Sequence, residues 1–110
     1  MSDYTPDKWL LLKITHNEDV FYKVFGTWGG GYLNGDCWRI NSGVESVEED
    51  GDYYHLIGYS DSKYICHKDM YGIVGSSNYG VLDKFIESGA VEVVDKVKII
   101  EVLNKIKVRG

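Results

Sequence analysis

Hydrophobic residues occur in short runs along the first two thirds of the chain, and polar residues separate these runs. Residues 9–15 and 20–25 are rich in aliphatic, β-branched and aromatic side chains, with four polar residues between them. This spacing predicts a β-hairpin with a four-residue turn. In the second run, apolar or aromatic side chains occupy both sets of alternating positions, so we expect this strand in the middle of a sheet.

Asp50 and Gly51 form the strongest short turn signal in the chain, and β-rich segments flank them on both sides. A type I′ hairpin turn needs positive φ at both central positions, which Asp and Gly adopt at low cost. A two-residue loop at this point would pair Val47 with Tyr54.

A second turn, with Ser60 and Asp61 as its loop, leads into a further β-rich segment at residues 63–67. This loop would place His55 opposite Cys66. Together the two turns predict that the middle of the chain is an antiparallel meander.

Residues 79–88 carry apolar side chains at helical spacing, and Ser77 or Asn78 can cap the N-terminus of this helix. Gly89 supplies the left-handed residue that commonly ends a helix. Residues 90–94 predict a short final strand. Residues 95–107 predict a second helix with one apolar face, although the segment VKII is also compatible with a strand.

Strands followed by helices, without regular alternation, predict an α+β fold. We expect a single domain over residues 1–110, with an antiparallel meander sheet of about five strands and one or two C-terminal helices packed on one face. Residues 1–8 are polar, contain the only proline and are expected to form a short N-terminal arm. The other face of the sheet would be partly open and, with nine tyrosines in the chain, aromatic.

The composition supports a folded protein rather than a disordered one, since 44% of the 110 residues are hydrophobic. Seventeen acidic and twelve basic residues give a net charge of −5, which argues against duplex nucleic acid as a partner. No signal-peptide pattern or long apolar run occurs, so we expect a soluble, cytoplasmic protein without membrane contact. The two cysteines are then expected to be reduced.

The most unusual stretch is residues 26–43, which contains six of the thirteen glycines and two of the three tryptophans. Glycine inside a strand or helix costs roughly 0.5–1 kcal/mol relative to alanine, so a local benefit is expected. Backbone amides of the Gly29-Gly30-Gly31 run could cradle a phosphate, but neither GxxxxGK[ST] nor GxGxxG is present. The alternative is a wide bulged turn whose glycines let the ring of Trp28, Tyr32 or Trp38 lie flat on the backbone.

Arg39 lies in a predicted strand, where it shares a face with Asn41 while Trp38 points to the other side. Its guanidinium group would either hold Asp36 in an internal clamp or contact a ligand or partner. Both interpretations stay open at this stage.

Cysteine and histidine residues do not form a convincing metal or catalytic site. Cys66 and His67 are adjacent, so their side chains point to opposite faces of a strand, and no CxxC or HxxxH spacing occurs. No nucleophile elbow or rigid pair of carboxylates is apparent. We therefore expect no catalytic activity, no metal and no cofactor.

The runs WLLLKI, YKVFGTW, GGYLNGDCWRINSG and YHLIGYSDSKYICHKDMYG resemble a group of small uncharacterised accessory proteins of bacteriophages and prophages. The resemblance covers about residues 9–80, and its most specific part is the GD-x-WR-x-NSG block. Cys37 and Ile40 stand where serine and leucine would be expected. The resemblance implies a phage origin and carries no activity with it. Location in the host cytoplasm would follow from that origin.

We expect a non-catalytic protein that binds and modulates a host protein, for example as an inhibitor of a defence system. One alternative is a protein that binds or sequesters a nucleotide through the glycine-rich loop. Another is a single-stranded nucleic-acid binder, which would need several lysines gathered on an aromatic face. Homodimerisation through sheet edges also stays open. The candidate binding residues are Trp28, Gly30, Gly31, Tyr32, Asp36, Trp38, Arg39, Asn41, Tyr53, His55 and Tyr59.

Overall fold

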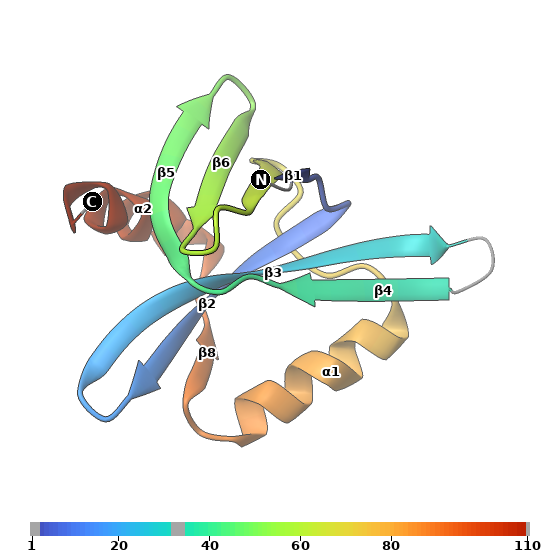
Figure 1. The fold of residues 1–110 in the computed structure, drawn as a ribbon. Helices are drawn as coiled ribbons and strands as arrows, with labels where there is room; N and C mark the ends of the chain where they lie inside the picture. Colours follow the sequence, from blue (N-terminus) through green and yellow to red (C-terminus); the bar gives the residue numbers. More distant parts are fainter. Residues whose placement is uncertain (1–2, 32–34, 110) are drawn as a thin grey trace.

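The computed structural model describes residues 3–31 and 35–109, and its longest strands lie in one antiparallel sheet (Figure 1). This first sheet has the strand order β4-β3-β2-β8. Its strands are β2 (Lys8–His16), β3 (Asp19–Gly31), β4 (Gly35–Ile40) and β8 (Val91–Val93). β3 has neighbours on both sides, which confirms its predicted place in the middle of a sheet.

The β2–β3 hairpin has a tighter turn than the sequence predicts. His16 pairs with Asp19, so Asn17 and Glu18 alone form the loop, and the predicted four-residue turn is wrong. Asn17 has a φ of 53°, and asparagine tolerates this left-handed conformation better than most residues. The polar residues around the turn therefore continue both strands.

A second sheet has the strand order β1-β7-β6-β5. β5 (Val44–Asp50), β6 (Tyr53–Gly58) and β7 (Lys63–His67) form the predicted meander, and β1 (Asp3–Tyr4) pairs with β7 in parallel. Part of the predicted N-terminal arm is thus a strand of this sheet. Pro6, which follows it, is buried.

The first turn of the meander lies one residue later than predicted. Asp50 pairs with Tyr53, so the loop is Gly51 and Asp52, and Gly51 has a φ of 57°. Val47 consequently pairs with Leu56 instead of the predicted Tyr54. A register shift of two residues leaves each side chain on its expected face, because the side-chain period of a strand is two.

The second turn of the meander is longer than the two-residue loop that was predicted. The amide of Gly58 donates to the carbonyl of Ser62, and Asp61 has a φ of 65°. Cys66 therefore lies opposite Tyr54 instead of the predicted His55. Both Tyr54 and Cys66 are buried, so the apolar packing of the inner face fixes this register.

The first helix, α1 (Ser76–Glu87), begins earlier than predicted. Asn78 does not cap it. Its buried side-chain amide instead donates to the carbonyls of Val74 and Cys37, at 2.7 and 3.1 Å, and so joins the helix to β4. Gly89 has a φ of 83°, as expected for the residue that ends a helix.

Residues 96–109 are helical, which resolves the helix-or-strand alternative. A 3₁₀ turn, η1 (Lys96–Lys98), leads into α2 (Ile99–Arg109). Asp95 precedes the turn, and its side chain makes no capping hydrogen bond. The predicted apolar stripe is buried and consists of Ile99, Val102, Leu103 and Ile106.

The first sheet is covered on both faces. One face packs against α1 through a cluster that includes Leu12, Phe25 and Leu82. The other face packs against the second sheet and α2 through a larger cluster that includes Leu11 and Leu103. The α+β class with antiparallel strands is confirmed. The strands divide between two sheets, so the face expected to be open is occupied.

Among the residues described, neither helix has the length and apolar character needed to cross a membrane.

Candidate functional site

The N-terminal segment lies across the glycine-rich part of β3. Pro6 packs against Gly26, where a Cβ would come within 3.1 Å of the proline ring. The indole Nε1 of Trp28 donates to the carbonyl of Thr5 at 3.0 Å, and the amide of Gly29 donates to the carboxylate of Asp7 at 3.0 Å. These glycines therefore allow close contact within the chain, and Asp7 places a negative charge where a phosphate would have to bind.

Gly30 and Gly31 end β3 beside a break in the regular pairing with β4. The register shifts between Trp28 and Gly31, which agrees with the predicted bulge. Tyr32, a candidate binding residue, lies outside the described residues.

Arg39 projects from β4 toward the N-terminal strand. Its guanidinium carbon lies 4.5 Å from the ring centroid of Tyr4, and Tyr4 in turn packs on Tyr64 with 5.1 Å between the ring centroids. Arg39 is exposed. The side chain of Asp36 lies outside the described part of the chain, so the predicted clamp between Arg39 and Asp36 stays a prediction.

Trp38 projects from the opposite face of β4, as the strand alternation predicts. Its ring stacks on Phe25 at 5.7 Å and meets Phe85 of α1 edge-on at 5.7 Å. Trp38 nevertheless keeps 41% of its surface exposed. The ring is held in place from behind and is accessible from outside, which suits an interface anchor.

β4 forms an edge of the first sheet, and no described strand pairs with its outer side (Figure 1). The amide of Asn41 donates to the carbonyl of Val24. Hydrogen-bonding residues alternate along an antiparallel strand, so Asn41 and Arg39 direct their backbone groups toward β3. The backbone groups of Trp38 and Ile40 therefore point away from the sheet.

Asn41 has a structural position instead of the predicted contact position. It is 4% exposed, and its Oδ1 accepts a hydrogen bond from the amide of Val24 at 2.8 Å. Its Nδ2 has no partner among the described residues. Its side chain thus replaces a backbone carbonyl and extends the β3–β4 pairing by one residue.

Tyr59 lies at the junction between the two sheets and is 63% exposed. Its ring covers Gly43, whose φ is 134°, and a Cβ at Gly43 would lie 3.0 Å from two ring carbons of Tyr59. An aromatic ring therefore lies on glycine backbone at Gly43, but it belongs to Tyr59, which is outside the glycine-rich stretch and was not among the rings predicted to do so.

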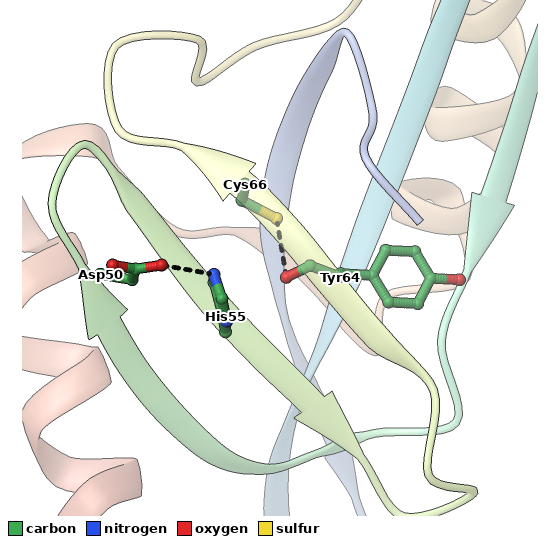
Figure 2. Close-up of polar contacts among 4 residues, drawn as sticks. All are labelled: Asp50, His55, Tyr64 and Cys66. Carbon is green, nitrogen blue, oxygen red and sulfur yellow. Dashed lines mark hydrogen bonds and ion pairs between the residues drawn. The ribbon is translucent and has the colours of Figure 1, made fainter. Parts of the chain in front are cut away.

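Tyr53 and His55 lie on the outer face of the second sheet, away from Trp38 and Arg39. The ring of Tyr53 meets that of His67 edge-on, with 5.0 Å between the centroids. His55 Nε2 lies 3.5 Å from a carboxylate oxygen of Asp50 (Figure 2). The predicted binding residues thus separate into a β4 group and a second-sheet group.

Cys66 is fully buried, and its thiol donates to the carbonyl of Tyr64 at 3.7 Å (Figure 2). Burial raises the pKa of the Cys66 thiol, so the nucleophilic thiolate is disfavoured. In the described part of the chain, no three His, Cys, Asp or Glu side chains are grouped as metal ligands.

The lysines that a nucleic-acid interface would need are distributed over different surfaces. Lys13 shares a face of β2 with Leu11, toward the second sheet, whereas Lys23 shares a face of β3 with Phe25, toward α1. Lys68 Nζ lies 2.6 Å from a carboxylate oxygen of Glu49.

A cavity of about 230 Å³ was missed by the sequence analysis. Its wall combines the buried rings of Trp9 and Tyr54 and the partly buried ring of Tyr71, which come from distant segments, with the start of α2. The sequence around Trp9 predicts only a strand, and the sequence around Tyr71 predicts only a loop. No local pattern therefore indicates that the two rings are in contact. A second hollow of about 260 Å³ is lined mainly by charged residues, which come from β2, β8, η1, α2 and the segment after β8.

In comparisons with known proteins, no family model, curated sequence or solved structure matches this chain.

Proposed function

We propose that this protein is a non-catalytic binding protein that modulates another protein by accepting one of its strands at the edge of β4. The observation that carries the proposal is the arrangement of Trp38 and Arg39 on opposite sides of an unpaired edge. Strand addition supplies main-chain hydrogen bonds for affinity, and the side chains on the two faces supply specificity. Tryptophan and arginine are also the residues that most often dominate interface energies.

The other long edge strand, β5, is protected against strand addition. Four of its seven residues are acidic: Glu45, Glu48, Glu49 and Asp50. Charged side chains on an edge strand discourage pairing with another chain. β4, with the sequence Gly-Asp-Cys-Trp-Arg-Ile, carries one acidic and one basic residue, Asp36 and Arg39. The two edges thus differ in the way expected if one of them is used for binding.

The partner strand should alternate in character to match the two faces of β4. Side chains on one face would contact Trp38 beside Phe85, which favours apolar residues. Side chains on the other face would approach Arg39, which favours acidic residues. The resemblance to phage accessory proteins makes a host protein, including a component of a defence system, the expected partner.

Nucleotide binding by the glycine-rich loop receives less support. The amide of Gly29 already donates to the carboxylate of Asp7, and a bound phosphate would be repelled by the same group.

The test is affinity purification of tagged variants from host lysate, with quantitative comparison of the bound proteins. Arg39→Ala removes the guanidinium group, and Ile40→Pro removes an amide that points away from β3. Glu48→Ala, on the protected edge, is the control. We expect one partner that the wild type and the control retain. Both β4 variants should retain about fivefold less of it or lose it, since a loss of about 1 kcal/mol in binding free energy produces a fivefold change.

Thermal unfolding of each variant checks that the fold is intact before partner lists are compared. The same proteins, in the same amounts, on all four baits would refute the proposal.

A further inference from the structure

The aromatic cavity lies between the start of β2, the inner face of β6 and the start of α2, away from the edge of β4. Its lining residues are Trp9, Tyr54, Lys68, Tyr71, Lys96, Ile99 and Ile100. Trp9 and Ile99 are buried, whereas Ile100 is exposed at the rim. The cavity is therefore a hollow in the core cluster that opens to solvent.

The aromatic walls are fixed by contacts behind them. The ring of Trp9 meets those of Tyr71 and Tyr54 nearly at right angles, with centroid distances of 4.8 and 6.2 Å. Trp9 Nε1 donates to the carbonyl of His67 at 2.8 Å, and the Tyr71 hydroxyl donates to the carbonyl of Val94 at 2.5 Å. Because these polar atoms are engaged inside the protein, the walls offer mainly apolar ring surface.

The volume limits the size of an occupant. An apolar protein cavity of about 150 Å³ is known to hold benzene. A volume of about 230 Å³ thus accommodates one six-membered ring with a small substituent. A nucleotide or a folded peptide segment is too large.

The charged groups in the lining are both positive. Lys68 Nζ lies 5.0 Å from the ring centroid of Tyr54 and is paired with Glu49, which does not line the cavity. Lys96 has no ion pair with any residue that the structure describes. A negatively charged substituent on the occupant would therefore meet the ammonium group of Lys96 and that of Lys68, which Glu49 and Asp52 partly neutralise. Asp95, whose charge acts on Tyr71, lies outside the lining.

We propose that this cavity binds a small monocyclic aromatic compound that carries a carboxylate group. The ring lies against Trp9 and Tyr71, and the carboxylate contacts Lys96 at the mouth. The site is separate from the proposed partner-binding edge and does not depend on it.

Three probes of nearly equal shape test the sign of the charge: phenylacetate, phenylacetamide and phenethylamine. Binding is followed by two-dimensional ¹H–¹⁵N spectra through the indole resonance of Trp9, with those of Trp28 and Trp38 as internal references. We expect the affinities to fall in the order anion, neutral amide, cation. The proposal would be overturned if phenethylamine bound as tightly as phenylacetate. It would also be overturned if millimolar phenylacetate left the indole resonance of Trp9 unchanged.

Two substitutions should change the phenylacetate affinity in opposite directions. Lys96→Ala should weaken binding by up to about fivefold, the change that loss of an exposed ion pair produces. Glu49→Gln should strengthen binding, because it releases Lys68. Lys105→Ala, on an exposed turn of α2 outside this cavity, is the matched control and should change nothing. The proposed site would be contradicted if the Lys96 and Lys105 substitutions changed the phenylacetate affinity equally. It would also be contradicted if Glu49→Gln weakened phenylacetate binding.

Discussion

Gly43 shows how one residue controls the passage between the two sheets. The chain leaves β4 after Ile40 and enters β5 at Val44, so only three residues make the connection. Gly43 has a φ of 134°, which side-chain-bearing residues rarely adopt, and the ring of Tyr59 covers it. Glycine is therefore required at this position for two reasons: the backbone has positive φ, and the Tyr59 ring leaves no space for a Cβ atom.

Substituting Gly43 by alanine should lower the free energy of unfolding by about 1–3 kcal/mol, through backbone strain and displacement of the Tyr59 ring. Gly80→Ala is the matched control, since Gly80 lies within α1 and a Cβ there meets nothing within 4 Å. This control should raise the free energy of unfolding by roughly 0.5–1 kcal/mol, the helix preference of alanine over glycine. Urea titration measures both changes. A destabilised Gly80 variant or an unaffected Gly43 variant would contradict this account.

At single positions, the strand alternation predicts more than the residue type does. Alternation correctly placed Trp38 and Arg39 on opposite faces of β4. Residue type alone suggested that Asn41 is a contact residue, yet its amide is buried. A polar residue at a strand end can either face solvent or replace a backbone group, and only the folded chain shows which one occurs.

At the scale of elements, Asn41 joins the end of β4 to β3 beyond the last regular pair. Asn41→Ala removes the oxygen that accepts the hydrogen bond of the Val24 amide. A buried amide without a partner costs about 1–3 kcal/mol, so the free energy of unfolding should fall by this amount.

Asn104→Ala provides the control for that substitution, because Asn104 is exposed on α2 and its loss should change stability by less than about 0.5 kcal/mol. Chemical denaturation of the two variants under the same conditions gives the comparison. Equal stability of the two variants would show that the Val24 amide finds another acceptor.

The identity of the elements follows from local sequence, whereas their registers do not. The apolar character of both faces of β3, the helical spacing in α2 and the glycine after α1 are local features, and the corresponding predictions are confirmed. The turn predictions failed by one or two residues in each of the three hairpins for which a turn was predicted, β2–β3, β5–β6 and β6–β7. A turn signal spreads over several polar residues, and burial of pairs such as Tyr54 and Cys66 decides among the registers.

At the scale of the whole molecule, the pH dependence of stability involves two tyrosines, Tyr64, which is buried, and Tyr71, which is partly buried. The Tyr71 hydroxyl bridges the backbone of β2 and the end of β8, through Leu11 and Val94. Burial raises the pKa of Tyr71 to about 12, although its hydrogen bond with Leu11 opposes the shift. Burial also raises the pKa of Tyr64 to about 12, while the positive charge of Arg39 acts to lower it.

Stability should therefore decrease as the pH rises from about 10 to about 12. In this window the unfolded chain releases these two protons while the folded protein keeps them, so each step up in pH favours unfolding. The urea midpoint, measured at intervals between pH 8 and pH 12, should be constant at first and then fall. Tyr71→Phe removes one of the two groups, so the urea midpoint should decrease less steeply with pH. Tyr79→Phe, at an exposed position of α1, should leave the pH dependence of the midpoint unchanged. A midpoint that stays constant up to pH 12 would contradict the assignment.

The division into two sheets could not be predicted from the sequence. The predicted meander is correct within each sheet, since β2–β3–β4 and β5–β6–β7 each connect neighbours in the chain. The pairing of β1 with β7 and of β8 with β2 joins segments that are far apart in sequence. No local pattern encodes these contacts, and they determine which faces are covered and where the aromatic cavity forms.

The positions of β1 and β8 have a consequence for how the chain folds. Each of them must close a long loop, β1 onto β7 and β8 onto β2, and each contributes only two or three paired residues in return. Loop-closure entropy opposes such contacts until the remainder of the structure exists. Both short strands should be added last and open first, so native-state hydrogen exchange should be faster at Val94, which follows β8, than at Val24 in the centre of the molecule.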